Sequence, residues 1–401
     1  MTAARALLLE NILSDAAWNL KDAGWDVERL DRALGEDELV ERLAGVQLLG
    51  LRSNTTVTAL VLESAPDLLA IGAFCIGTNQ IDLTAAADKG VAVFNAPFSN
   101  TRSVVELALS EIIALTRRLT EKNAEMHAGR WDKSAVGSHE VRGRRLGIVG
   151  YGNIGSQLSV LAEALGMSVL FFDTADKLAL GNARRCGTLD ELLAESDVVT
   201  LHVDGRVSNS SFFGEEQFSR MRAGSLFLNL SRGFVVDHLA LRAHIESGHI
   251  AGAAVDVFPV EPKSKGEEFV SELRGLPNVI LTPHVGGSTE EAQQDIGHFV
   301  SGKLRDYAAD GNTALSVNLP QVALPRSGGP RLLHLHVNTP GVLASVTSIL
   351  ADHGVNIEGQ LLATRASLGY VVTDVASTTE MAALTEALCA MPETVRLRVL
   401  P

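Results

Sequence analysis

The sequence has few of the features that mark disulfide-stabilised, membrane-spanning or nucleic-acid-binding proteins. Its 401 residues include only three cysteines, Cys75, Cys186 and Cys389. They form no CxxC or His–Cys cluster, which favours reduced thiols and gives no sign of a zinc site. Basic residues are also scarce. The chain has 34 Lys and Arg against 48 Asp and Glu, and its net charge of −14 disfavours binding to nucleic acid or anionic lipid.

Long hydrophobic runs are absent as well. Stretches such as Leu68–Ile76 are far shorter than the roughly 18 apolar residues of a membrane helix. The run Leu7–Leu9 is interrupted at once by polar residues, and no cleavage site of small residues follows it, so we expect no signal peptide. These absences predict a cytoplasmic protein that binds neither membranes nor nucleic acid.

The chain does contain enough apolar material for several hydrophobic cores. Hydrophobic residues make up 46% of it and charged residues 20%, a composition typical of globular proteins. At roughly 150 residues per domain, the length predicts about 2.7 domains. We therefore expect a multi-domain globular protein.

The first hundred residues alternate short apolar runs with helical segments, which is typical of a parallel α/β sheet. The predicted strands are Ala6–Leu9, Val46–Leu51, Leu68–Ala73 and Val91–Phe94, and the predicted helices are Asp37–Leu43, Thr56–Ser64 and Gln80–Lys89. One long amphipathic stretch follows over Ser103–Gly129, and its length suits a connection between two lobes.

A second α/β series begins near Arg145. Its predicted strands are Leu146–Gly150, Ser168–Asp173, Val198–Val203, Ser225–Asn229, Gly252–Val257 and Val279–Thr282. Their continuous apolar character is typical of strands buried on both faces. A helix over Glu290–Ala309 comes next, and the Gly- and Pro-rich segment Pro325–Pro330 indicates a linker.

The last seventy residues predict a third module with the order βαββαβ, the split ferredoxin-like arrangement. Its elements are the strand Arg331–Asn338, the helix Pro340–His353, the strands Val355–Thr364 and Leu368–Ala376, the helix Thr379–Met391 and the strand Thr394–Leu400. Period two puts His334, His336 and Asn338 on one face of the first strand. That pattern suits either an exposed polar face or a binding face.

A glycine motif directly follows the first strand of the second series and opens a helix. Gly150 would make the tight turn, Gly152 would let the backbone approach a pyrophosphate, and Gly155 would let the helix pack on the strand. Asp173 ends the next strand, where a carboxylate would accept hydrogen bonds from a ribose and repel a 2′-phosphate. The sequence therefore predicts a dinucleotide site that favours NAD over NADP.

Three polar residues lie on turns that follow later strands. Arg232 in Ser231–Gly233 could hold an anionic substrate, and Glu261 and His284 could move a proton. Each alone is also explained without function, as a surface arginine, a solvated turn carboxylate or a loop histidine. Together they suit an oxidoreductase that moves a hydride on or off carbon.

These motifs resemble the D-isomer-specific 2-hydroxyacid dehydrogenases. The matching segments are GYGNIG at 150–155, SRG at 231–233, DVFPVEP at 256–262 and TPHVGG at 282–287, with further matches at 50–53, 71–80 and 95–103. Within the family, the chain is similar to the bacterial short-form enzymes of serine biosynthesis that carry a C-terminal ACT domain. The resemblance implies NAD-dependent oxidation of D-3-phosphoglycerate to 3-phosphohydroxypyruvate.

The resemblance also assigns roles to residues. Arg232 would grip the substrate carboxylate, His284 would exchange the proton of the C2 hydroxyl, and Glu261 would raise the pKa of His284 and fix its tautomer. The implied NAD contacts are Gly150, Gly152, Asn153, Ile154, Gly155, Asp173, Leu230, Ser231, Asp256, Val285, Gly286 and Gly287. The implied substrate contacts are Arg52, Ser53, Asn100 and Lys133, and the implied contacts of the effector L-serine are His336, Asn338 and Asn356.

Family architecture implies an interleaved domain order. Residues 1–99 and 287–322 would form the substrate-binding domain, 100–286 the NAD-binding Rossmann domain, 323–330 a linker and 331–401 the ACT domain. The cleft between the lobes would close on substrate, and the enzyme would be a homotetramer inhibited by L-serine.

Two segments depart from the family pattern. Asn54 replaces a second arginine near Arg52, and Val203–Arg206 replaces a proline-containing turn near the cofactor. Two alternative functions also remain open. One is the same chemistry on another 2-hydroxy acid, including reduction of 2-oxoglutarate, and the other is an NAD(H)-sensing protein without activity.

Overall fold

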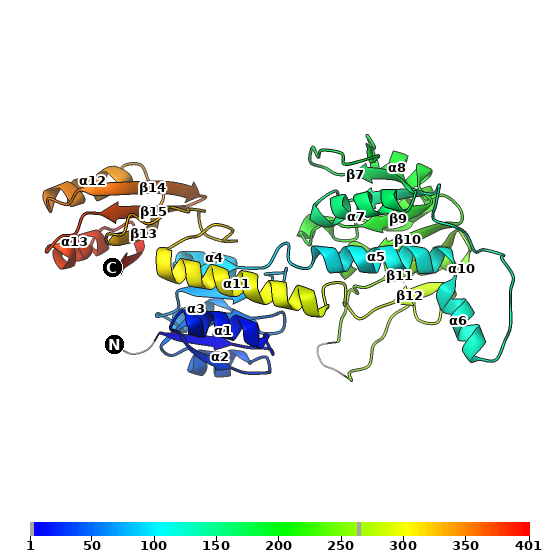
Figure 1. Ribbon diagram of the computed structural model, residues 1–401, viewed down its shortest axis with the longest axis horizontal. Helices are drawn as coiled ribbons and strands as arrows, with labels where there is room; N and C mark the ends of the chain where they lie inside the picture. Colours follow the sequence, from blue (N-terminus) through cyan, green and yellow to red (C-terminus); the bar gives the residue numbers. More distant parts are fainter. Residues whose placement is uncertain (1–3, 263–265) are drawn as a thin grey trace. The chain divides into compact units, whose positions relative to one another are not determined.

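The computed structural model describes residues 4–262 and 266–401 (Figure 1). The chain divides into two compact units, one formed by Met1–Ser99 and Gln294–Pro401 and the other by Asn100–Gln293. Three sheets build these units, two parallel and one antiparallel. The predicted α/β class, with two Rossmann-like or flavodoxin-like domains and a ferredoxin-like module, is confirmed.

The first sheet has five parallel strands in the order β2-β1-β3-β4-β5, a flavodoxin-like arrangement. Its strands are β1 (Arg5–Leu8), β2 (Asp26–Arg29), β3 (Val46–Leu51), β4 (Ala70–Ala73) and β5 (Ala92–Phe94). Its helices are α1 (Ser14–Asp22), α2 (Glu36–Arg42), α3 (Ala59–Ser64) and α4 (Leu83–Asp88). Two elements were not predicted from the sequence, α1 and β2, because they are short and polar between their few buried positions.

Each face of this sheet is covered by a separate hydrophobic cluster. Helices α2, α3 and α4 pack on one face. Helix α1 packs on the other, together with the long helix α11 (Glu290–Asp310). Beyond α11 the chain returns to β5, where the Asn318 side chain bonds the N–H of Val93 and the carbonyl of Val91. Residues far apart in sequence thus complete one α/β layer.

The C-terminal module has the predicted order βαββαβ. It comprises β13 (Arg331–Val337), α12 (Val342–Asp352), β14 (Ile357–Arg365), β15 (Leu368–Val375), α13 (Met381–Cys389) and β16 (Thr394–Leu400), and its antiparallel sheet has the order β14-β15-β13-β16. Leu332 faces the two helices. Leu333 and Leu335 point the other way and join the cluster that covers the first sheet.

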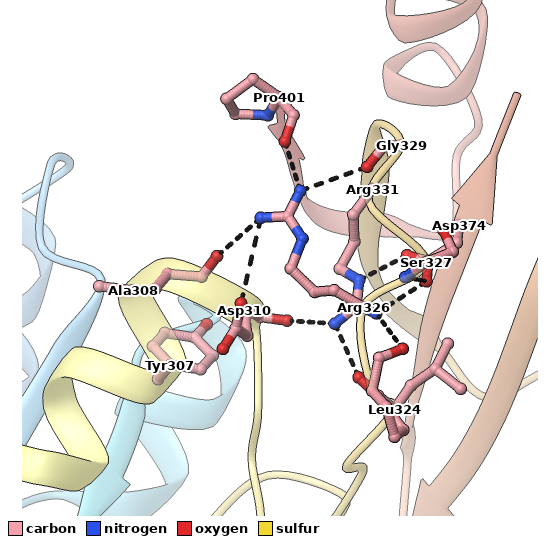
Figure 2. Close-up of polar contacts among 12 residues, drawn as sticks. Tyr307, Ala308, Asp310, Leu324, Arg326, Ser327, Gly329, Arg331, Asp374 and Pro401 are labelled. Atoms are coloured by element: carbon pink, nitrogen blue, oxygen red, sulfur yellow. Dashed lines mark hydrogen bonds and ion pairs between the residues drawn. The ribbon is translucent and has the colours of Figure 1, made fainter. Parts of the chain in front are cut away.

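Arg331 bonds this module to the end of α11 and to the segment that precedes β13. Arg331 is 1% exposed and pairs with Asp374, with its Nε 2.5 Å from Oδ1 and its Nη2 2.8 Å from Oδ2. The same guanidinium donates to the carbonyls of Asp310 and Leu324 (Figure 2). It also donates to the carbonyl of Pro325. The segment before β13, expected as a linker, is therefore bonded to the module at several points.

The second unit contains a seven-stranded parallel sheet in the order β12-β11-β10-β9-β6-β7-β8, a Rossmann-type arrangement. Its strands are β6 (Arg145–Val149), β7 (Ser168–Phe172), β8 (Arg184–Arg185), β9 (Val198–Leu201), β10 (Ser225–Asn229), β11 (Ile250–Val255) and β12 (Val279–Leu281). Helices α5 (Thr101–Thr116) and α7 (Asn153–Ala164) pack on one face. Helices α8 (Leu189–Glu195), α9 (Glu215–Arg220) and α10 (His238–Glu246) pack on the other.

The stretch predicted as one amphipathic segment over Ser103–Gly129 is two helices, α5 and α6 (Leu119–His127). Arg118 between them has a left-handed backbone with φ of 52°, which ends α5 and redirects the chain. The break leaves α6 without a buried residue. The two-residue strand β8 was not predicted either. In residues 4–262 and 266–401, no helix is long and apolar enough to cross a membrane.

Candidate active site

The glycine turn after β6 has the geometry that a dinucleotide requires. Gly150 has a positive φ of 93°, and a Cβ there would lie 2.6 Å from the carbonyl oxygen of His202. A Cβ on Gly155 would lie 2.3 Å from the carbonyl oxygen of Gly150, so α7 packs closely on β6. At Gly152, by contrast, a Cβ would meet nothing within 4 Å.

The first turn of α7 is open to an anion. Gly152 caps the helix without a side-chain hydrogen bond, so the N–H groups that follow, including those of Asn153 and Ile154, are not covered by a capping side chain. Free N–H groups and the positive end of a helix dipole together favour a phosphate. These residues therefore fit the pyrophosphate of NAD.

Asp173 directly follows β7 beside the glycine turn. Its Oδ2 accepts from the N–H of Tyr151 at 2.8 Å, and its Oδ1 accepts from the N–H of Ala175 at 2.8 Å. These two bonds fix the direction of the carboxylate next to the turn, and each oxygen keeps a lone pair for a ribose hydroxyl.

Arg232, Glu261 and His284 follow three neighbouring strands, β10, β11 and β12, at the same edge of the sheet. The carboxyl ends of parallel strands are where ligands of such sheets bind. Arg232 also lies close enough to lower the pKa of both other side chains by its charge. The structure thus brings the three predicted residues into one cluster.

Glu261 and His284 form a hydrogen-bonded pair. The Nδ1 of His284 lies 2.9 Å from Oε2 of Glu261, and Oε1 of Glu261 accepts from the N–H of Phe258 at 3.0 Å. The bond to Glu261 is the main cause that raises the pKa of His284, and burial opposes it. Burial raises the pKa of Glu261, but the bonds from His284 and Phe258 outweigh it and leave that pKa below its usual range.

The pairing selects one nitrogen of His284 for chemistry. A carboxylate can only accept, so Nδ1 carries the hydrogen and Nε2 is the atom that can exchange a proton. The side chain is 49% exposed, which leaves it accessible to a substrate. A cavity of about 650 Å³ lies beside the pair, with Phe258, Phe269 and Leu281 in its wall.

Asp256 fixes the turn that carries His284. Its Oδ1 accepts from the hydroxyl of Thr282 at 2.6 Å and from the N–H of Val285 at 2.8 Å, and its Oδ2 accepts from the N–H of Gly286 at 2.9 Å. His284 itself has a left-handed backbone with φ of 54°. Such strain persists only where the surroundings over-determine it, and Asp256 supplies that constraint.

Asn229 and Gly233 fix the turn that carries Arg232, and neither was predicted as a functional residue. The Asn229 side chain accepts from the N–H and hydroxyl of Ser231 and donates to the carbonyl of Arg232. A Cβ on Gly233 would lie 1.9 Å from the carbonyl carbon of Phe258. A polar residue at the end of an apolar strand was a usable signal for Asn229, whereas the Gly233 contact depends on the tertiary fold.

We expect Gly233→Ala to destabilise the protein and to disturb the Glu261–His284 pair. The added methyl group would overlap the Phe258 backbone, and relieving the overlap costs about 2 kcal/mol or more of unfolding free energy. Thermal unfolding measures the loss. The control is Gly302→Ala in α11, where a Cβ meets nothing within 4 Å, and an equal loss there would contradict the expected role of the contact.

The predicted substrate contacts are found on different elements. Arg52 and Ser53 follow β3 in the first unit, and Asn100 precedes α5 in the second. A Cβ on Gly287 would lie 2.3 Å from Nδ2 of Asn100, whose Oδ1 is buried without a hydrogen-bond partner in the described chain. Lys133 lies in an exposed loop with its Nζ 5.9 Å from the centre of the Trp131 ring.

In the C-terminal module, His334 and His336 are each 2% exposed, so the alternative of an exposed polar face is wrong for these two residues. Burial lowers the pKa of His334 to about 4. The Nδ1 of His336 bonds the carbonyl of Val337, and its Nε2 is buried with no partner among the residues described. Asn338 and Asn356 are exposed, and no recorded bond joins either of them to His336.

The segment Val203–Arg206, which departs from the family pattern, lies against Arg232. Asp204 forms an ion pair with Arg206, and a Cβ on Gly205 would lie 3.3 Å from Nε of Arg232. A larger residue than glycine would therefore press on the guanidinium. Over residues 4–262 and 266–401, no group of three or more His, Cys, Asp or Glu side chains could hold a metal ion.

A Rossmann-type sheet whose three neighbouring strand ends present an arginine and a His–Glu pair defines a dehydrogenase of small hydroxy acids. Comparisons with known proteins specify the class further. Residues 109–286 match the NAD-binding domain of the D-isomer specific 2-hydroxyacid dehydrogenases. Residues 332–396 match the AHAS small subunit-like ACT domain.

Relatives match along nearly the whole chain. A D-3-phosphoglycerate dehydrogenase of Haemophilus influenzae is 50% identical over 98% of this chain and 96% of its own. One of Escherichia coli is 49% identical over 98% of this chain and 97% of its own. Among solved structures, the D-lactate dehydrogenase of Aquifex aeolicus in complex with NAD and lactic acid aligns with a TM-score of 0.66 at 26% identity, covering 76% of this chain and 95% of its own.

The chain therefore belongs to the D-isomer-specific 2-hydroxyacid dehydrogenases. It is an NAD-dependent oxidoreductase that groups, over its full length, with the D-3-phosphoglycerate dehydrogenases. The predicted cofactor, NAD, is confirmed at the level of the family.

Proposed function

We propose that the protein oxidises D-3-phosphoglycerate to 3-phosphohydroxypyruvate, the first step of L-serine biosynthesis. The observation that carries the chemistry is the Glu261–His284 pair with Arg232 beside it at one sheet edge. The assignment of the substrate is supported by the similarity to D-3-phosphoglycerate dehydrogenases over 98% of the chain. When bound, NAD supplies the hydride acceptor.

His284 takes the proton of the C2 hydroxyl at Nε2 during oxidation and returns it during reduction. Glu261 stabilises the imidazolium that forms, because its carboxylate lies 2.9 Å from Nδ1. Arg232 binds the substrate carboxylate with two parallel N–H groups and polarises the C2 oxygen. Its turn is held by Asn229 and Gly233, so the guanidinium is positioned before substrate arrives.

The proposed NAD contacts lie along the strand ends of the same sheet. The adenosine ribose would be held by Asp173. The pyrophosphate would be held by Gly150, Gly152, Asn153, Ile154 and Gly155. Around the nicotinamide we propose Leu230, Ser231, Asp256, Val285, Gly286 and Gly287. Asp256 acts there through the 282–286 turn that its two oxygens bind.

Arg52, Ser53, Asn100 and Lys133 are the proposed contacts of the substrate's phosphate and carboxylate. Two of them are cations, and the protein as a whole carries a net charge of −14. Affinity for an anionic substrate must therefore come from local cations and not from the overall field.

A substrate panel tests the assignment. NADH consumption is followed with 3-phosphohydroxypyruvate, its unphosphorylated analogue hydroxypyruvate, and 2-oxoglutarate. We expect the phosphorylated acid to give the highest kcat/KM. Equal or better turnover of an unphosphorylated acid would transfer the function to another 2-hydroxy acid, and no turnover of any acid would favour an NAD(H)-sensing protein.

Glu261→Gln is expected to move the pH dependence of oxidation to lower pH. Glu261 raises the pKa of His284, so removing its charge lowers that pKa. Neutral imidazole is the proton acceptor in oxidation, so the acidic limb of the kcat profile shifts down. For reduction, which needs imidazolium, the basic limb shifts down as well. Profiles from about pH 5 to about pH 9 cover the titration range of histidine.

A control variant shows whether the shift in the pH profile is specific to Glu261. The exposed Glu268 in the same loop region provides the control, since Glu268→Gln removes one negative charge without touching His284. An unshifted Glu261→Gln profile, or an equal shift in Glu268→Gln, would remove Glu261 from the proton-transfer mechanism.

We propose that L-serine inhibits the enzyme by binding to the ACT domain through His336, Asn338 and Asn356. Asn338→Ala is expected to raise the L-serine concentration for half inhibition by about tenfold or more, the effect of losing one well-made hydrogen bond of ~1.4 kcal/mol. Activity without serine should persist. Thr379→Ala, an exposed polar position of the same module, is the control. Undiminished inhibition in Asn338→Ala would exclude this site.

We propose a cytoplasmic homotetramer in which residues 1–99 and 287–322 form the substrate-binding domain, 100–286 the NAD-binding domain, 323–330 the connection and 331–401 the ACT domain. Sedimentation at several protein concentrations tests the tetramer.

A further inference from the structure

Glu10 is a buried acid that the proposed mechanism does not use. It follows β1 and is 7% exposed. Its Oε1 accepts from the N–H groups of Arg52 at 3.2 Å and Thr55 at 2.8 Å, and its Oε2 accepts from the N–H of Asn54 at 2.9 Å. No ion pair of Glu10 with a Lys, Arg or His side chain is recorded in the described parts of the chain. Backbone N–H groups of the 52–55 turn are thus its recorded partners.

The backbone at Glu10 is held in an unfavourable conformation. Glu10 and Asn11 both have left-handed backbones, with φ of 61° and 53°. Neither is glycine, so each costs free energy that the surrounding contacts must offset. This geometry carries the chain from β1 toward the turn after the adjacent strand β3, where Glu10 meets its three N–H partners.

A second residue holds the same turn from its carbonyl side. The Nε2 of Gln80 donates to the carbonyl oxygen of Arg52 at 2.6 Å, and Gln80 is 8% exposed. Glu10 and Gln80 therefore bond the backbone groups of the 52–55 turn, although they lie 42 and 28 positions from Arg52 in the sequence. The turn is fixed by tertiary contacts and not by its own sequence.

The turn lies where a ligand of this fold binds. In a parallel sheet with the order β2-β1-β3-β4-β5, the strand order reverses between β1 and β3, and the crevice outside their carboxyl ends is the ligand site. Ser53 and Asn54 are exposed there. The guanidinium of Arg52 has no recorded hydrogen bond or ion pair within residues 4–262 and 266–401.

We propose that Glu10 is a positioning residue that fixes the 52–55 turn so that Arg52 and its neighbours meet the anionic end of the substrate. The inference rests on the proposed function, which assigns Arg52 to the substrate. Glu10 is not itself a substrate ligand, because it is buried and its carboxylate would repel a phosphate. Glu10 takes the N–H groups of Arg52, Asn54 and Thr55, so the Arg52 side chain and the Ser53 residue of this turn are left to meet the substrate.

The test compares Glu10→Gln with the unaltered protein in reduction of 3-phosphohydroxypyruvate by NADH. Glutamine can keep the two bonds at Oε1, but its amide nitrogen then faces the N–H of Asn54, two donors together. We expect KM for 3-phosphohydroxypyruvate to rise about tenfold, equivalent to ~1.4 kcal/mol. The kcat at saturation and the dissociation constant of NADH should stay the same.

A double-mutant cycle distinguishes an effect of Glu10 through the 52–55 turn from a general loss of structure. If Glu10 acts through the turn, most of its effect on KM disappears in an Arg52→Ala background, whereas a structural defect adds to it in full. The matched control is Glu28→Gln on β2, whose carboxylate pairs at the surface with Arg5 and Arg42. Gln80→Ala releases the turn from its other side and should raise the same KM.

Specific outcomes overturn the proposal. An unchanged KM in Glu10→Gln, a full effect in the Arg52→Ala background, or an unchanged KM in Arg52→Ala itself would each do so. If Glu10→Gln does not fold, an unchanged KM in Gln80→Ala overturns it instead. Failure of the proposed function looks different, since the unaltered protein would then reduce 3-phosphohydroxypyruvate no better than an unphosphorylated acid, or not at all.

Discussion

Replacing His284 with asparagine is expected to lower kcat roughly a hundred- to ten-thousand-fold, the usual contribution of a general acid or base. Nε2 of His284 is the atom that exchanges the substrate proton, because Nδ1 is bonded to Glu261. Asparagine removes that base. It also tolerates the left-handed backbone with φ of 54°, which alanine adopts less readily. Asp256 still holds the N–H groups of Val285 and Gly286, so the turn should keep its form.

Steady-state reduction at saturating substrate measures this loss, and the quenching or enhancement of NADH fluorescence measures cofactor affinity. We expect the NADH dissociation constant to change little, because the proposed cofactor contacts are other residues. His127→Asn, an exposed histidine at the end of α6, is the control. A His284→Asn enzyme with normal kcat would remove His284 from the proton transfer.

Arg232→Lys is expected to lower kcat/KM by roughly a hundredfold or more, the size of a lost charge-assisted hydrogen bond of about 3 kcal/mol. Lysine keeps the charge but cannot present two parallel N–H groups to a carboxylate. Asn229 and Gly233 fix the turn around Arg232. The backbone therefore cannot move to make up for the shorter reach of a lysine side chain. Both KM for the oxo acid and kcat should suffer.

Arg222→Lys is the matched control, since Arg222 forms an exposed ion pair with Asp197 in the same unit. Exposed pairs of this kind contribute little. Equal kcat/KM in Arg232→Lys and the unaltered enzyme would show that charge alone suffices at this position, and would argue against two-point binding of the carboxylate.

The apolar runs of the sequence placed Glu261 and His284 on turns that follow strands, and the resemblance to the family implied that the two side chains form a pair. Strand ends are readable from apolar runs, and neighbouring strands place their ends together. The order of helices and strands in the C-terminal module could also be predicted from the apolar runs of its sequence. What could be predicted was therefore where functional side chains sit relative to strands.

The residues that hold the functional side chains could not be predicted in this way. Glu10 reaches a turn more than forty positions away, and the contact of Gly233 with Phe258 joins two loops. The burial of His334 and His336 also depends on what covers the sheet, and a period-two pattern does not reveal that. The break at Arg118 is one backbone conformation inside an otherwise continuous amphipathic pattern.

The shared hydrophobic cluster beneath the C-terminal module bears on how such a chain can change in evolution. Leu333, Leu335 and Tyr370 lie in the same cluster as residues of the first sheet, and Arg396 donates to the backbone carbonyls of Pro66 and Leu68. A module joined only by a flexible linker could be replaced by another domain without changes elsewhere in the chain. Here the inner face of the module is part of another domain's interior, so a replacement must match that surface. Substitutions on the two sides are expected to be coupled.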